Sequence, residues 1–185
     1  CREGLDILPP EIKRIEIKGI GESFDIVSEL ECIDVVVHLA GLAHVLNEKN
    51  IEGHDEYHKV NTLGTKALAS QCVKAGVGRF VFLISLKVHG DYSELGSPIT
   101  TTSKIQPVGQ YAQSKYDAEL ALCQIASQSN LEFVIIRPPL VYGKGVKANF
   151  RSLIKLVNLG IPLPLSSASN NLRSLVSRDN LIDLI

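Results

Sequence analysis

Two residues in the segment Tyr-Ala-Gln-Ser-Lys have side chains that together can move a proton. Tyr111 and Lys115 are four residues apart, so on a helix they lie on one face. A phenol with a pKa of about 10 is a poor base at neutral pH, but a nearby ammonium favours the phenolate and lowers that pKa. Such a pair can take the proton of an alcohol while hydride leaves its carbon. The spacing alone is weak support, and a solvated helix face is the alternative.

Two further candidates stand where apolar runs end. The run Asp-Val-Val-Val-His ends in Leu39, Ala40 and Gly41, and small residues there allow a flat, phosphate-bearing cofactor to approach the backbone. A plain strand-to-loop turn accounts for the same residues. Ser85 ends the run Arg-Phe-Val-Phe-Leu-Ile-Ser. Its hydroxyl can donate to a substrate or cap its own backbone.

Residues 143–148 (Gly-Lys-Gly-Val-Lys-Ala) formally fit the dinucleotide fingerprint G-x-G-x-x-A. The two prolines at 138–139 interrupt the strand-to-turn geometry that this fingerprint needs, and about twenty residues on the chain has Ala168 instead of an acid. We interpret the segment as a loop near an anionic substrate, with Lys144, Lys147 and the following helix N-terminus facing phosphate.

The elements that must position these residues alternate between short apolar runs and helical periods. Strands are predicted at 14–18, 34–39, 79–85, 131–137 and near 174–176, and helices at 55–75, 111–127, 149–159 and from 179. This alternation predicts an α/β fold with a Rossmann-like, doubly wound parallel sheet and right-handed crossovers. Ligands of such sheets bind beyond the carboxyl ends of the strands. The long segment 89–110 is predicted to be an active-site loop.

Composition narrows the function classes. The chain has 185 residues, 45% of them hydrophobic, and a net charge of -1, which disfavours nucleic acid as a partner. Its apolar runs are shorter than a membrane span needs. The four cysteines are too widely spaced to predict a metal site or disulfides, and they indicate a cytoplasmic protein. Because no methionine occurs, we expect the chain to be a piece of a longer protein.

Six segments, in their order and spacing, resemble the extended short-chain dehydrogenase/reductase family. The resemblance is nearest to the NAD-dependent epimerase/dehydratase enzymes that are like UDP-glucose 4-epimerase and act in surface-polysaccharide pathways. The segments are DVVVHLAGLAHV, YHKVNTLGT, RFVFLISLKVHG, YAQSKYDAE, VIIRPPLVYGKGVKANF and NLRSLV, and they cover most of the chain from Asp34 onward.

The resemblance implies a role for each matching residue. Tyr111 is implied to be the acid/base, Lys115 to hold the nicotinamide ribose, and Ser85 to complete the catalytic set. The residues implied to contact the cofactor, NAD with NADP left open, are Leu39, Ala40, Gly41, Asn61, Tyr111, Lys115 and Pro138. The residues implied to bind a nucleotide-sugar substrate are Ser85, Asn149 and Arg173, the last two at its diphosphate.

The same resemblance implies the domain organisation. Residues 1–137 correspond to part of a dinucleotide-binding domain, and residues 138–185 to part of a substrate-binding region interleaved with the last strands of the sheet. The family's first strand and glycine-rich turn are absent from the sequence, so we expect the isolated chain to bind NAD poorly and to be inactive. A homodimer through the helices around 55–75 and 111–127 is expected.

Among the family's activities, the leading hypothesis is 4-epimerisation of a UDP-hexose or UDP-N-acetylhexosamine by transient hydride transfer to bound NAD. A 4,6-dehydratase has an acid and a base directly after the catalytic Ser/Thr, and this chain has Leu86 and Lys87 there. An NAD(P)H-dependent reductase of a keto sugar or other carbonyl stays open, because it uses the same three catalytic residues. Retention of those residues argues against a non-enzymatic sensor.

Overall fold

A three-stranded parallel sheet forms the centre of the fold. The computed structural model describes residues 9, 11–21, 23–43, 56–145, 148–160 and 171–185, without the side chains of 148–150. Strands β1 (Val35–His38), β2 (Arg79–Leu83) and β3 (Glu132–Ile136) lie in the order β1-β2-β3. Val36 pairs with Phe80, which pairs with Phe133. These β-branched and aromatic runs suit a pleated, buried surface, and the predicted parallel sheet is confirmed.

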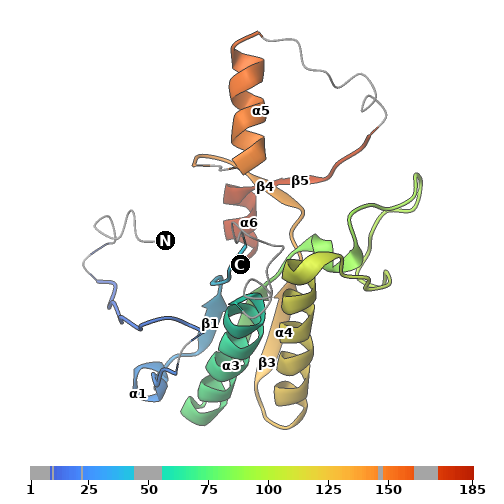
Figure 1. Ribbon diagram of the computed structural model, residues 1–185. Helices are drawn as coiled ribbons and strands as arrows, with labels where there is room; N and C mark the ends of the chain where they lie inside the picture. The colour runs from blue at the N-terminus through green and yellow to red at the C-terminus, as the bar shows by residue number, and fades with distance from the viewer. Residues whose placement is uncertain (1–8, 10, 22, 44–55, 146–147, 161–170) are drawn as a thin grey trace.

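Two long helices cover one face of this sheet. A π-helix (η2, His58–Leu63) runs directly into α3 (Gly64–Ala75), and α4 (Gly109–Ser127) lies beside it (Figure 1). Gly76 ends α3 in the left-handed conformation, with φ of 78°, and its N–H donates to the carbonyls of Cys72 and Val73. Glycine adopts this conformation without a Cβ penalty, so the predicted helix stop is confirmed.

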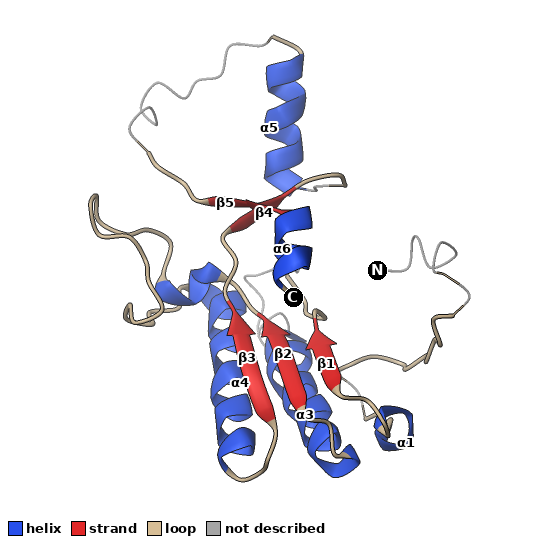
Figure 2. Cartoon of the chain, turned by 180° about the vertical axis from the view of Figure 1, so that it is seen from behind, coloured by secondary structure: helices blue, strands red, loops and turns tan. Residues whose placement is uncertain are grey.

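The core lies between that sheet face and the two helices. Phe80 and Phe82 of β2 are fully buried and pack with residues of α3 and α4, among them Leu68, Cys72, Ala118 and Leu122. Figure 2 shows the opposite face, where no helix in the described part of the chain covers the strands. Consequently Val35, Val37 and Val134 are 41–47% exposed.

A second, smaller unit lies beyond the carboxyl ends of these strands (Figures 1 and 2). Strands β4 (Leu140–Tyr142) and β5 (Leu175–Ser177) pair in parallel, and α5 (Ala148–Asn158) and α6 (Arg178–Leu184) adjoin them. Ser177 caps α6 by accepting a hydrogen bond from the N–H of Asn180. The helices predicted at 149–159 and from 179 are therefore confirmed, as is the strand near 174–176.

One predicted strand is absent from the described part of the chain, and three short elements were not predicted. Residues 14–18 form no strand, because they have no hydrogen-bonded neighbour strand among the described residues. Strand β4 was not predicted, since it directly follows two prolines, which do not donate to a ladder. A 3-10 helix (η3, Leu86–His89) and the short helix α1 (Val27–Leu30) were also not predicted.

Gly64 joins η2 to α3 against the backbone of Ile20. A Cβ at this position would lie 2.4 Å from the Ile20 carbonyl oxygen and 3.0 Å from its carbon. Gly64→Ala is therefore expected to lower the free energy of unfolding by about 1–3 kcal/mol, although alanine favours a helix interior by about 1 kcal/mol. Urea unfolding measures this free energy. The control Lys66→Ala, on the exposed side of α3, is expected to change the free energy of unfolding by less than about 0.5 kcal/mol. Equal stability of Gly64→Ala and wild type contradicts the close packing of Gly64 on Ile20.

Candidate active site

Lys115 is a buried cation on α4, close to the carboxyl end of β1. The residue is 3% exposed, and its Nζ lies 5.0 Å from the centre of the Phe82 ring. Its hydrogen bond to the carbonyl oxygen of Ala40 is long, at 3.5 Å. Burial lowers the pKa of Lys115 to about 8, because water no longer solvates the ammonium fully. An ammonium has three donors, so this one is well placed to donate to a bound hydroxyl.

Gly41 leaves the space in which the Lys115 ammonium lies. A Cβ built at Gly41 would be 2.5 Å from Lys115 Nζ and 3.1 Å from Asn61 Oδ1. The small residues predicted at this strand end therefore have a specific reason, the close approach of a buried side chain to the backbone. The neighbouring Leu39 is 61% exposed and Ala40 is also exposed, so this strand end is open to a ligand.

Gly41→Ala is expected to displace the Lys115 ammonium and to lower turnover of the intact protein about 10–100-fold, since a 1 Å misplacement near the chemistry has an effect of that size. The fold should tolerate the change, because the nearest atom is the flexible end of a lysine. Steady-state kinetics and a thermal melt measure the two effects. Gly78→Ala is the control, with its nearest contact at an ordinary 3.4 Å. Wild-type turnover of Gly41→Ala contradicts the assignment.

Tyr111 lies one turn before Lys115, in the first turn of α4. Its half-buried ring meets the ring of Tyr57 edge to face, with centroids 6.1 Å apart. Burial, and then the charge that Tyr57 can carry, raise the pKa of Tyr111 above its usual value. The sequence predicted a lowered pKa for Tyr111, and in the chain as described this net direction is wrong. Burial prevails, and Tyr111 is a proton donor at neutral pH.

Asn61 connects the strand end to the helix that carries Tyr111 and Lys115. It is fully buried in the π-helical segment, a geometry often found at functional sites. Its amide accepts from the N–H of Leu42 at 2.7 Å and donates to the Leu42 carbonyl at 3.0 Å. It also donates to Ser114 Oγ at 2.9 Å, and Ser114 Oγ donates to the Tyr111 carbonyl. The structure thus brings Asn61, residues 40–42 and the Tyr111–Lys115 turn together.

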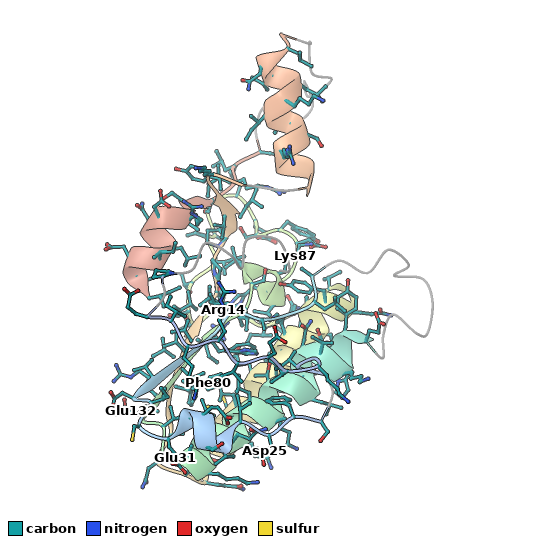
Figure 3. The ribbon with its side chains drawn as sticks, turned by 90° about the vertical axis from the view of Figure 1, so that its left-hand side faces the viewer. Arg14, Asp25, Glu31, Phe80, Lys87 and Glu132 are labelled. Atoms are coloured by element: carbon teal, nitrogen blue, oxygen red, sulfur yellow. The ribbon has the colours of Figure 1, made fainter. Side chains whose placement is uncertain are left out.

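Ser85 lies between β2 and η3, where it caps the helix. Its Oγ accepts a hydrogen bond from the N–H of Lys87 at 3.3 Å. The capping alternative is therefore present, and an acceptor role leaves the hydroxyl proton available to a substrate. The N–H of Leu86 donates to the Pro138 carbonyl at 3.1 Å, which brings Ser85 and Pro138 to one edge of the sheet. Figure 3 shows Lys87 toward the end of the molecule that carries β4 and β5, with Phe80 below it in the sheet.

The residues predicted to bind the diphosphate lie on the second unit. Arg173 is exposed in the segment before β5. Asn149 falls in the first turn of α5, and its side chain lies outside the described part of the structure. The Lys144 carbonyl accepts from Arg178 Nη1 at 3.1 Å, which ties the loop after β4 to α6. Lys147 lies outside the described residues.

Other features do not add to this site. A hollow lined by Cys123, Leu131 and Val134 lies at the opposite end of the strands. Among the described residues, no group of three acidic, histidine or cysteine side chains is placed to hold a metal ion. None of the described helices is both long and apolar enough to cross a bilayer.

Comparison with known proteins decides the family. The model of the NAD dependent epimerase/dehydratase family matches residues 5–185. The chain belongs to this family. It is 48% identical over 170 residues to a UDP-glucose 4-epimerase of Vibrio cholerae, covering 92% of this chain and 52% of that protein. A dTDP-D-glucose 4,6-dehydratase of Mus musculus is 32% identical over 115 residues, 62% of this chain and 31% of that protein.

Solved structures of extended short-chain dehydrogenases confirm the Rossmann-type fold of this epimerase/dehydratase chain. MoeE5 in complex with UDP-glucose and NAD superposes with a TM-score of 0.74 at 27% identity, covering 90% of this chain and 55% of that one. DesIV, a dTDP-glucose 4,6-dehydratase from Streptomyces venezuelae, superposes with a TM-score of 0.73 at 27% identity, covering 89% of this chain and 51% of that one. The chain therefore spans about half the length of the relatives it matches.

Proposed function

We propose that the intact protein is a nucleotide-sugar 4-epimerase that acts on a UDP-hexose or UDP-N-acetylhexosamine. The observation that carries this proposal is the meeting of Tyr111, Lys115 and Asn61 at the carboxyl end of β1. The 48% identity to a UDP-glucose 4-epimerase supports the choice of reaction within the family.

The residues at this site fit the nicotinamide end of NAD. Leu39 and Ala40 are exposed at this strand end, and the buried Lys115 ammonium offers donors to a ribose hydroxyl. The residues proposed to hold the cofactor are Leu39, Ala40, Gly41, Asn61, Tyr111, Lys115 and Pro138. When bound, NAD would supply reversible acceptance of the hydride of carbon 4, the chemistry that inversion at that carbon needs.

The chain's own residues move the proton. Tyr111 Oη takes the proton of the sugar 4-hydroxyl and later gives one back, so the same group acts as base and acid. A positively charged cofactor ring and the Lys115 ammonium would favour the phenolate, against the burial that raises its pKa in this structure. Ser85 donates to the same sugar oxygen and orients it.

Arg173 and Asn149 are proposed to bind the diphosphate of the substrate. Both come from the unit beyond the carboxyl ends of the strands, where ligands of such sheets bind. A guanidinium is suited to this role because its planar fork matches two phosphate oxygens. The exposure of Arg173 leaves it accessible to a phosphate from solution.

A homodimer through η2, α3 and α4, in the cytoplasm, completes the proposal. Leu63 and Leu120 on these helices are 49% and 50% exposed, which leaves apolar surface for a second copy. Sedimentation of the intact protein tests the dimer. That the isolated 185-residue chain binds NAD poorly and is inactive stays a prediction. Micromolar binding of NAD by this chain in calorimetry contradicts the expectation of poor binding.

Product analysis of the intact protein with UDP-glucose and UDP-N-acetylglucosamine tests the proposed function. The expected result is the 4-epimer of at least one of them, without net formation of NADH. Consumption of NADPH with a keto sugar, and no epimer, favours the reductase alternative. A 4-keto-6-deoxy product indicates a dehydratase, as in two of the relatives, although Leu86 and Lys87 replace the acid and base of that reaction.

A further inference from the structure

His38 is a buried imidazole that the proposed chemistry does not use. It is the last residue of β1 and is 3% exposed. Its Nε2 lies 2.9 Å from Thr65 Oγ1 on α3. Its ring stacks on the ring of Phe82, with centroids 5.2 Å apart and an angle of 14° between the planes. A buried polar group with such specific neighbours calls for a physical reason.

The hydrogen bonds of Thr65 determine which nitrogen of His38 carries the proton. Thr65 Oγ1 lies 2.6 Å from the Asn61 carbonyl oxygen, which can only accept. A hydroxyl has one proton, so Thr65 donates it to Asn61. Thr65 Oγ1 must then accept from His38, whose neutral imidazole is protonated at Nε2. The hydrogen-bond chain runs from β1 to the backbone of the π-helical segment.

The hydrogen bonds from His38 through Thr65 end at Asn61, close to Lys115. The side-chain amide of Asn61 binds Leu42 and Ser114, which belong to the two segments that flank the Lys115 ammonium. On the other side, the Phe82 ring contacts both the His38 ring and Lys115 Nζ, which is 5.0 Å from the Phe82 centroid. His38 is therefore linked to Lys115 through Thr65 and Asn61 along one path and through Phe82 along the other.

The imidazole stays neutral in this position. Burial, and then the charge of Lys115, lower the pKa of His38 to about 4. A second cation next to the buried ammonium would be repelled, because charges interact more strongly away from water. A neutral imidazole has one nitrogen that donates and one that accepts, and in His38 the donor is the Nε2–H directed at Thr65.

We propose that His38 is a positioning residue for the acid/base pair: through Thr65 it holds Asn61, and through Phe82 it supports the Lys115 ammonium. This inference rests on the proposed function only for its kinetic readout. Loss of the hydrogen bonds from His38 through Thr65 to Asn61 should admit water to Lys115 and loosen its placement, while leaving the exposed substrate contacts unchanged.

The test compares four variants of the intact protein, two at each end of the bond. His38→Phe keeps a ring and removes the donor, and His38→Gln keeps a donor near the Nε2 position. Thr65→Val removes the hydroxyl, and its matched control Thr65→Ser retains it. For each, kcat and KM are measured with the nucleotide sugar that wild type converts, and lysine side-chain NMR follows the titration of Lys115.

His38→Phe and Thr65→Val are each expected to lower kcat about 10–100-fold, with KM within about threefold. The double variant should have about the same kcat as either single variant, because both substitutions break the same series of hydrogen bonds. Thr65→Ser should stay near wild type, and His38→Gln should recover part of the loss. In the two impaired variants the pKa of Lys115 should move upward from about 8, toward the ordinary lysine value.

Wild-type kcat in folded His38→Phe and Thr65→Val overturns the proposal. So does a fall in kcat with an unmoved Lys115 titration, because that indicates general loosening instead. If His38→Phe does not fold, the Thr65→Val and Thr65→Ser pair decides. If wild type converts no nucleotide sugar, the proposed function fails, and the Lys115 titration still tests the role of His38.

Discussion

Tyr111→Phe abolishes turnover of the intact protein, with an expected loss of about 10²–10⁴-fold in kcat, the usual contribution of a general acid or base. The phenyl ring can keep its edge-to-face contact with Tyr57, so the start of α4 stays in place. Only the oxygen that holds the proton is lost. Bound NAD should be retained, because Lys115, Asn61 and the strand end at 39–41 are unchanged.

Steady-state kinetics and the absorbance of bound nucleotide measure these two expectations. Tyr92→Phe is the control, because Tyr92 is 85% exposed on the segment between η3 and α4. Turnover of Tyr111→Phe near that of Tyr92→Phe means that another group moves the proton.

Lys115→Met is expected to remove activity and to stabilise the fold. A change from the usual pKa of 10.5 to about 8 corresponds to about 3 kcal/mol of unfavourable interaction for the buried ammonium at neutral pH. Methionine fills a similar volume without charge and packs adaptably. The free energy of unfolding at pH 7, measured by urea on protein freed of nucleotide, should rise by about 1–3 kcal/mol.

The pH dependence gives the sign of this effect independently. Between pH 8 and 10.5 the unfolded chain holds the Lys115 proton and the folded chain does not, so wild-type stability rises with pH in that window. Below pH 8 the cost is fully present. Lys115→Met should lack this rise, and Lys66→Met, at an exposed lysine, should retain it. A less stable Lys115→Met contradicts the burial of an unfavourable charge.

Local sequence patterns predicted most of the fold. The runs at 35–38, 79–83 and 132–136 consist mainly of apolar β-branched and aromatic residues, and they form the three sheet strands. Residues 14–18 also contain β-branched residues, at every second position, but a strand needs a hydrogen-bonded neighbour as well, which no local pattern supplies. Strand β4 was missed for the opposite reason, since its pairing with β5 prevails over the prolines before it.

The candidate site was predictable in its residue types and less so in its contacts. The four-residue spacing placed Tyr111 and Lys115 on one turn, and Gly41 was found as a small residue at a strand end. The roles of Ser114, Thr65 and His38 depend on contacts between residues 27–53 positions apart, which spacing does not reveal. The pKa of Tyr111 was predicted in the wrong direction, because burial is a property of the folded chain.

Isotope tracing tests the central claim most directly. The intact protein is incubated in ordinary water with the nucleotide sugar that it converts, carrying deuterium at carbon 4. Transient hydride transfer at the Tyr111–Lys115 site predicts the 4-epimer with deuterium still at carbon 4 and no net NADH. Loss of the deuterium to water, or its accumulation in released cofactor, contradicts a 4-epimerase of this mechanism.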